Sequence, residues 1–296
     1  MTFLFKAASK PAFAWLCVGW ALCAALVLGA YAFWPAIGWL LILAELLRIG
    51  AFAIATLLCW RNAKEDAIVS GQIVWQAIAL GLCFYALGDT VALLWHLLWG
   101  LSTTAPLRDV FHGVSYLLLS IGLFNAVLPR QTSLSIPQTL SIAAVGIFGI
   151  LFASWVNLPT GEPSSLSDIA ARHVAEADQA PAIVQTIDTR LLPIADKMDL
   201  LYIAGDCILI VVAGALLVAF WGGTYAKAWR LIALAGLCLY TADMFMIYHS
   251  AQDSYAPGSL WEIFWIASAL LFGAGASVEH RVSTQMQEKR SQPQWI

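Results

Sequence analysis

Charged residues are scarce in this sequence. Lys, Arg, Asp and Glu make up 11% of the 296 residues, whereas hydrophobic residues make up 61% and the mean hydropathy is +0.79. This composition excludes an ordinary soluble domain and indicates an integral membrane protein. The net charge of -3 provides no basic surface for phosphate groups, so we expect no nucleic-acid partner.

The motifs of common catalytic and nucleotide-binding sites are also missing. There is no G-x-S-x-G, no P-loop and no G-x-G-x-x-G, so nothing favours an enzyme. Acid and histidine pairs can act as general acid and base, which leaves lipid hydrolysis as an alternative.

The sequence identifies no cofactor. No C-x-x-C spacing occurs, and we interpret the six cysteines as buried structural thiols inside apolar stretches: Cys17, Cys23, Cys59, Cys83, Cys207 and Cys238.

Long apolar stretches are what the sequence does contain. Eight of them are long enough to cross about 30 Å of hydrocarbon. They lie near residues 12–33, 36–60, 70–99, 109–128, 138–157, 199–221, 228–249 and 258–277. Because only helices or closed barrels satisfy the backbone inside a bilayer, we predict an all-α integral membrane protein with eight transmembrane helices.

Basic residues near the ends of the spans predict the orientation. With the N-terminus inside, ten basic residues are cytoplasmic: Lys6, Lys10, Arg61, Lys64, Arg130, Lys227, Arg230, Arg281, Lys289 and Arg290. Four are outside: Arg108, Arg172, Arg190 and Lys197. The positive-inside rule therefore places both termini in the cytoplasm. The first apolar run is longer than that of a secretory signal, so we expect it to be retained.

One polar segment, residues 158–198, separates spans five and six and would lie outside. Apolar residues recur in it at helical spacing, which predicts one or two amphipathic helices on the outer surface of the membrane. The two sets are Ile183, Ile187, Leu191 and Ile194, and Ile169, Ala170, His173, Val174 and Ala177. Forty residues are too few to fold alone, and a cap over the bundle is the simpler interpretation.

The two halves of the chain resemble each other. Glu45 and Trp60 match Asp206 and Trp221, and Trp75 and Asp89 match Trp229 and Asp243, with equal spacings within each pair. Further along, Ala105-Pro106, Asp109 and Phe111-His112 match Ala256-Pro257, Glu262 and Phe264-Trp265. These matches predict two parallel four-helix repeats, residues 1–130 and 131–278, followed by a cytoplasmic tail at 279–296. A duplication retained only for packing is the alternative.

Ionisable residues inside the spans are the main functional indication, because a charge at the bilayer centre costs about 2.5–3.5 kcal/mol on insertion scales. Glu45 and Arg48 lie three residues apart, on one helical face, and can form an ion pair. Asp206 has no basic residue one turn away. We interpret Glu45, Arg48 and Asp206 as an intramembrane charge network, in which Arg48 also contacts one of the other buried acids.

A ligand-binding pocket is predicted between the repeats in the outer leaflet. Its candidate residues are Asp89, His96, Asp109, His112, Asp243, His249, Glu262 and Trp265. Imidazole and carboxylate groups also suit transition metals, and matched histidines can ligate haem, so His96, His112 and His249 are candidate metal ligands. Histidines at a membrane interface often only form hydrogen bonds, and this spacing matches no metal-binding motif.

Several short motifs resemble the N-terminal eight-helix membrane sensor region of some bacterial diguanylate cyclases (GGDEF/EAL) and related signalling proteins. These motifs are Ala86-Leu-Gly-Asp89 with Trp95, Pro106-Leu-Arg-Asp109-Val-Phe with Gly113 and Tyr116, Asp199-Leu-Leu-Tyr202-Ile-Ala-Gly-Asp206, and Ala242-Asp243. The resemblance covers residues 36–277 and implies a sensor module in a bacterial inner membrane. Eighteen residues follow the last span and cannot hold an output domain, so signalling would require a separate partner chain.

Three functions remain open from the sequence. The first is an integral membrane sensor or ligand-binding module with a small-molecule or cation ligand and a cytoplasmic or membrane signalling partner. The second is a proton- or cation-coupled transporter of a small solute, because intramembrane acids also mark ion pathways. The third is a haem- or metal-binding membrane protein.

Overall fold

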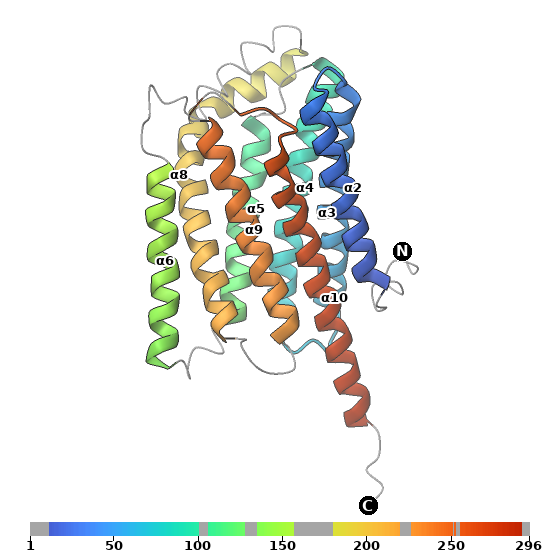
Figure 1. The fold of residues 1–296 in the computed structure, drawn as a ribbon, viewed down its shortest axis with the longest axis vertical. Coiled ribbons are helices and arrows are strands. Elements are labelled where there is room, and N and C mark those ends of the chain that lie inside the picture. The colour runs from blue at the N-terminus through green and yellow to red at the C-terminus, as the bar shows by residue number, and fades with distance from the viewer. Residues whose placement is uncertain are drawn as a thin grey trace, which may run out of the picture.

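The computed structural model of the protein describes residues 12–100, 106–127, 135–156, 180–219, 226–250, 252 and 255–291. These residues form α-helices and one 3-10 helix, and the described ranges contain no strand. In chain order the helices are α2 (Ala12–Phe33), α3 (Gly38–Ala63), α4 (Gln72–Trp99), α5 (Pro106–Val127), α6 (Ile136–Val156), α8 (Ala182–Ala219), α9 (Ala226–Ser250), η3 (Leu260–Glu262) and α10 (Ile263–Ser291) (Figure 1).

Within the part of the chain that the structure describes, eight helices are long and apolar enough to span a membrane, and they coincide with the eight predicted stretches. Their outward faces carry large exposed apolar side chains, among them Leu22, Leu98, Phe124 and Phe148. Exposed apolar surface spread over every side of a bundle is unfavourable in water and favourable against lipid. The predicted all-α membrane fold with eight spans is therefore confirmed, whereas the division into two repeats stays a prediction.

Six helices form a closed ring in the order α3, α4, α5, α8, α9 and α10, with α10 packed against α3 again. Outside the ring, α2 packs against α3 and α10, and α6 packs against α8. The ring encloses large buried side chains, including Trp75 of α4 and Trp229 of α9, whose ring centres lie 5.7 Å apart. We call the end of the bundle at which α4 and α9 finish the upper end, as drawn in Figure 1.

Proline and glycine define the connections at the upper end. Pro35 lies in the turn between α2 and α3, and Pro106 is the first residue of α5, where its missing N–H breaks no helical hydrogen bond. Before η3 the chain turns at Gly258, whose φ of +84° is unfavourable for other residues. The backbone N–H of Gly258 donates to Glu262 Oε1 at 2.7 Å, so this turn positions a buried acid at the start of α10.

The predicted amphipathic helix around Ile183 is not a separate element. It is the first part of α8, which continues through Pro193 into span six. Proline removes a hydrogen bond from a helix interior and bends it, and this segment crosses obliquely over the upper end of the bundle in Figure 1. Val184 packs there against Trp95 and Trp99 of α4, so the segment caps the bundle. The other predicted helix, at 169–177, lies outside the described residues.

The predicted tail also begins inside a helix. α10 continues to Ser291, and Glu279, where the tail was expected to start, is completely buried. Apolar residues stop recurring after the span, but helix propensity does not, because the following Gln, Glu, Lys and Arg residues are strong helix formers. At the lower end α10 projects beyond the other helices (Figure 1).

All six cysteines lie in the described spans and none forms a disulfide. Only Cys59 is buried, and Cys23 is exposed on the outer face of α2. The prediction of buried thiols is therefore wrong for most of them, because a span of a membrane protein can direct a small apolar side chain toward lipid as well as toward the core.

Candidate functional site

A buried group of charged side chains lies in the upper half of the ring, centred on Arg48 of α3. Its Nε donates to Asp89 Oδ2 of α4 at 2.8 Å, and Nη1 donates to Glu262 Oε2 of η3 at 2.9 Å. Its Nη2 donates to Glu45 on the same helix, the contact that the helical spacing predicts. Each of these four side chains is at most 3% exposed, so water does not screen their charges.

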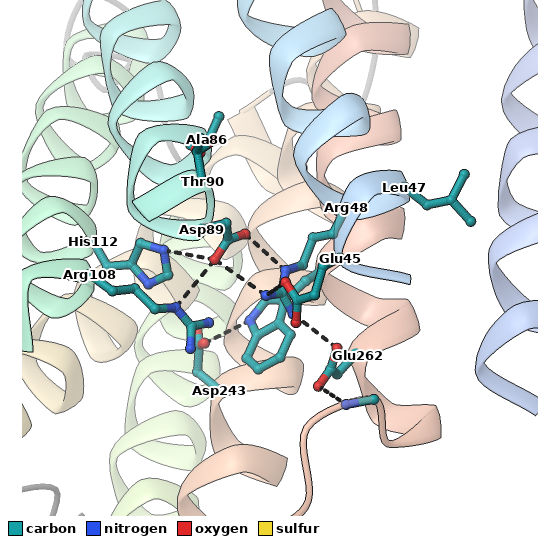
Figure 2. A network of polar contacts seen from close by, with 12 residues as sticks. Glu45, Leu47, Arg48, Ala86, Asp89, Thr90, Arg108, His112, Asp243 and Glu262 are labelled. Atoms are coloured by element: carbon teal, nitrogen blue, oxygen red, sulfur yellow. Dashed lines mark hydrogen bonds and ion pairs between the residues drawn. The ribbon is translucent and has the colours of Figure 1, made fainter. Parts of the chain in front are cut away.

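Asp89 joins this group to α5. Its Oδ1 lies 3.3 Å from Arg108 Nε and 3.2 Å from His112 Nε2, while Oδ2 accepts from Arg48 (Figure 2). The His112 ring stacks on Tyr85, with 4.0 Å between the ring centres. We call Glu45, Arg48, Asp89, Arg108, His112 and Glu262 the arginine cluster.

Glu262 connects the arginine cluster to a small cavity at the upper end. Its Oε1 accepts from the Gly258 backbone and lies 3.4 Å from the hydroxyl of Tyr255. Burial raises the pKa of Tyr255 and the neighbouring Glu262 raises it further, so the phenol keeps its hydrogen. The cavity, of about 10 Å³, is also lined by His249, Ser259, Trp261 and Trp265, and it has room for one water-sized group.

A second buried group lies beside the first and contains Asp206 of α8 and Asp243 of α9. Asp243 Oδ1 accepts from Trp265 Nε1 of α10 at 2.9 Å, and Oδ2 accepts from the hydroxyl of Tyr116 of α5. The Asp206 carboxyl lies against Asp243 and Tyr116. Asp206 is completely buried, and among the described residues no donor forms a hydrogen bond to either of its oxygens. We call Asp206 and Asp243 the aspartate pair.

The structure brings together five of the eight residues predicted for the ligand pocket: Asp89, His112, Asp243, Glu262 and Trp265. His249 lines the small cavity beside Glu262. Asp109 points instead toward α8, where its Oδ1 lies 3.2 Å from the Tyr202 hydroxyl. His96 lies half-buried in the last turn of α4, two turns beyond Asp89. Whether these residues bind a ligand stays a prediction.

Of the predicted charge network, Glu45 and Arg48 pair directly, whereas Asp206 belongs to the aspartate pair.

Two residues of the site, Arg108 and Tyr116, were not predicted as site residues from the sequence. The sequence predicts Arg108 as one of the outer basic residues, but it is a buried residue of the first turn of α5. The signal that identifies it is its place two residues after Pro106, the first residue of the helix, where a long side chain can reach back into the bundle.

The three candidate metal ligands do not form a metal site. His112 contacts Asp89, His249 lies 6.3 Å from the Trp261 ring, and His96 is two turns above. Within the described ranges, no group of three or more His, Cys, Asp or Glu side chains is arranged to hold a metal ion.

A smaller polar group lies at the lower end of the ring. Glu279 Oε1 of α10 accepts from the Ser70 hydroxyl, and Trp75 Nε1 donates to the same hydroxyl oxygen at 2.8 Å. Apolar side chains, including Ile78, Leu82 and Phe272, fill the core between this group and the arginine cluster. We call Ser70, Trp75 and Glu279 the lower polar group.

Comparison with known proteins gives no relative. No family model matches the chain, and no curated protein and no solved structure is similar to it. The resemblance to the sensor regions of diguanylate cyclases therefore stays a prediction.

Proposed function

We propose that this protein is an integral membrane sensor module that binds a small cation at Glu262 and passes the binding event to a partner chain. The observation that carries the proposal is the composition of the arginine cluster. It contains three carboxylates, Glu45, Asp89 and Glu262, but two guanidinium groups, Arg48 and Arg108. With all three carboxyl groups ionised, one further positive charge would neutralise the cluster, either a bound cation or a proton on a carboxyl group or on His112.

The cavity beside Glu262 is where that charge can be bound. Buried ions in the membrane interior must be paired, because an isolated charge there is expensive. Glu262, Tyr255 and Ser259 are the residues with side-chain oxygen atoms beside a space of about 10 Å³ that is otherwise lined mainly by apolar and aromatic side chains, and this space is too small for an organic ligand. Carboxylate and hydroxyl oxygen atoms are ligands of hard cations such as Na⁺, Mg²⁺ and Ca²⁺.

Helix α10 offers a route from this cavity to the lower end. Glu262 immediately precedes α10, Trp265 lies in its first turn, and the helix then runs without interruption to Ser291. Its last turns project beyond the bundle (Figure 1), where a cytoplasmic or membrane signalling partner can reach them if the lower end is cytoplasmic. Because Arg108 is buried, three of the four predicted outer basic residues remain, against ten predicted inner ones. This larger difference supports the orientation in which both termini are cytoplasmic.

The contacts in the two halves also support the predicted repeat. His112 contacts Asp89, and Trp265 contacts Asp243, at positions that match in the sequence alignment of the halves. The matched residues Trp75 and Trp229 meet in the core. A pseudo-twofold axis through the centre of the ring would relate α3, α4 and α5 to α8, α9 and α10, and would place the site at the interface of the halves.

Cation binding is tested with the purified protein in lipid nanodiscs, by measuring its thermal unfolding midpoint in the chlorides of sodium, potassium, magnesium and calcium. We expect one cation to raise the midpoint in proportion to the logarithm of its concentration above Kd. Glu262→Gln should abolish this increase, whereas Asp66→Asn, which removes an exposed acid, should retain it. If no cation raises the midpoint, or if Glu262→Gln responds like the unchanged protein, the site assignment is wrong.

Signal transfer is tested by measuring the distance between spin labels at Asp66 and Gln287, both exposed near the lower end, after the native cysteines have been replaced. Addition of the stabilising cation should change the distance distribution, and Glu262→Gln should show no change. An unchanged distribution in the original sequence would contradict the sensor function while leaving cation binding intact.

A proton- or cation-coupled transporter is the second candidate, because the lower polar group places a further buried acid, Glu279, at the opposite end of the ring. The apolar core between the two groups would then have to open during transport. Cation flux into proteoliposomes that depends on both Glu262 and Glu279 would favour this function over the sensor.

A further inference from the structure

We propose that the aspartate pair is a buried proton-binding site, in which Asp206 carries a hydrogen that it shares with the ionised Asp243. The site is separate from the cation site proposed at Glu262. It joins α8 to α9, and Tyr116 of α5 and Trp265 of α10 complete it.

The donors around Asp243 identify it as the ionised member. Both of its oxygens accept hydrogen bonds, one from the Tyr116 hydroxyl and the other from Trp265 Nε1 at 2.9 Å. An indole N–H can only donate, and hydrogen bonds to a charged acceptor are stronger than those to a neutral one. The contacts of Asp243 therefore favour a carboxylate there.

The surroundings of Asp206 are different. Its side chain is 0% exposed, and no donor among the described residues makes a hydrogen bond of good geometry to its oxygens. The Tyr116 hydroxyl lies beside both carboxyl groups, but it has a single hydrogen, which it donates to Asp243. A buried ionised carboxylate without donors, next to a second carboxylate, is unfavourable, whereas a neutral carboxyl group has a hydrogen to donate to Asp243.

The predicted repeat accounts for the lack of an arginine beside Asp206. Glu45 in the first half matches Asp206 in the second, and Arg48, three residues after Glu45, matches Leu209. Leu209 is completely buried in the core. The place that a guanidinium group takes beside Glu45 is thus apolar beside Asp206, and a proton is the smallest positive charge that can neutralise Asp206.

A metal ion fits this site less well than a proton. The indole N–H of Trp265 and the hydroxyl hydrogen of Tyr116 point at the carboxylate where a metal would bind, and both would oppose a cation there. Two adjacent carboxyl groups that share one proton are an established arrangement in proteins.

The other ionisable groups near the pair do not replace the proton. Arg108 acts on Asp243 from α5 but belongs to the arginine cluster, where it lies 3.3 Å from Asp89. The remaining neighbours are neutral thiol and phenol groups, namely Tyr85 of α4, Tyr202 and Cys207 of α8, and Tyr240 of α9. Helix α6, which packs on α8, contains no ionisable side chain.

Loss of the proton would place two negative charges side by side between α8 and α9. Their repulsion in a buried site is strong because little water is present to screen it. The distance between α8 and α9 can therefore depend on pH. The pH that matters is that on the side of the membrane from which protons reach the aspartate pair.

The proposal is tested by infrared spectroscopy of the full-length protein in lipid membranes at neutral pH. A protonated carboxyl group has a C=O stretching band that an ionised carboxylate lacks and that shifts in D₂O. We expect Asp206→Asn to remove the band of one carboxyl group, because the amide replaces the neutral acid and donates to Asp243 in its place. Asp66→Asn, an exposed control, should leave the spectrum in this region unchanged.

A measurement on the unchanged sequence makes the test independent of how the variants fold. Biosynthetic labelling with ¹³C-aspartate should shift the band, which assigns it to aspartate rather than glutamate. A band that neither the label nor Asp206→Asn affects would overturn the proposal. So would removal of the band by sodium or calcium chloride at constant pH, because the pair would then bind a metal cation. These results do not depend on whether Glu262 binds a cation.

Discussion

The guanidinium carbon of Arg48 lies 5.2 Å from the centre of the Trp265 indole ring. The N–H at the edge of the same ring donates to Asp243. Trp265 therefore separates the arginine cluster from the aspartate pair and contacts both, through a cation–π interaction on its face and a hydrogen bond at its edge. A change in either group can reach the other through this one side chain.

The variant Trp265→Phe distinguishes these two contacts. It keeps an aromatic ring near Arg48 but removes the hydrogen bond to Asp243, so we expect a loss of about 1.5–3 kcal/mol in unfolding free energy, the range for hydrogen bonds to charged groups. Combining it with Asp243→Asn should cost less than the sum of the two single changes, because both remove the same contact. Additive losses in denaturant unfolding of the detergent-solubilised protein would show that the contact contributes nothing.

Replacing Arg48 by Leu should destabilise the protein severely. The change leaves Glu45, Asp89 and Glu262 without their shared donor, and breaking a buried ion pair from one side costs about 3–5 kcal/mol. Lys64→Leu removes an exposed basic residue of the same region of sequence and should change stability by less than about 0.5 kcal/mol. Similar unfolding midpoints for the two variants would contradict a stabilising role for Arg48.

Gly88→Ala should disturb the arginine cluster without changing a charge. A Cβ atom at this position would lie 2.7 Å from His112 Cδ2 and 3.1 Å from the Arg108 carbonyl oxygen, so α4 and α5 would have to separate. Overpacking of this kind costs about 1–3 kcal/mol. Gly19→Ala in α2, where no atom lies within 4 Å, is the matched control and should be neutral or stabilising. Thermal unfolding of both variants makes the comparison.

The lower polar group predicts a difference between two substitutions of Glu279. Glu279→Gln keeps an oxygen that accepts from the Ser70 hydroxyl, so we expect a small loss of stability. Glu279→Leu removes the acceptor of the partly buried Ser70 hydroxyl and should cost about 1–3 kcal/mol. Chemical denaturation in nanodiscs measures both, and equal losses would indicate that the negative charge, rather than the hydrogen bond, is what stabilises this group.

The features that the sequence predicted well are those that depend on neighbouring residues. Eight apolar runs predict eight helices, because hydrophobicity over some twenty residues decides membrane insertion locally. The contact between Glu45 and Arg48 follows from helical spacing alone. The burial of Asp89 and Asp243 follows from their positions well inside apolar runs.

Other features depended on how the helices pack. Arg108 resembles a loop charge in the sequence because it lies at the end of a span, yet the packing of α5 against α4 directs its side chain to Asp89. Asp109, the next residue, is rotated by about 100° around the same helix and faces Tyr202 of α8 instead. Adjacent residues in one sequence motif thus belong to different contacts.

The aspartates at matched positions illustrate the same division. The sequence by itself determined that Asp89 and Asp243 lie well inside apolar spans and that each must find partners away from water. Only the tertiary structure decided that Asp89 is paired with two arginines, whereas Asp243 lies against Asp206 with Tyr116 and Trp265 as donors. The physical reason is that burial is a property of each helix, but the neutralisation of a buried charge depends on side chains that other helices bring to it.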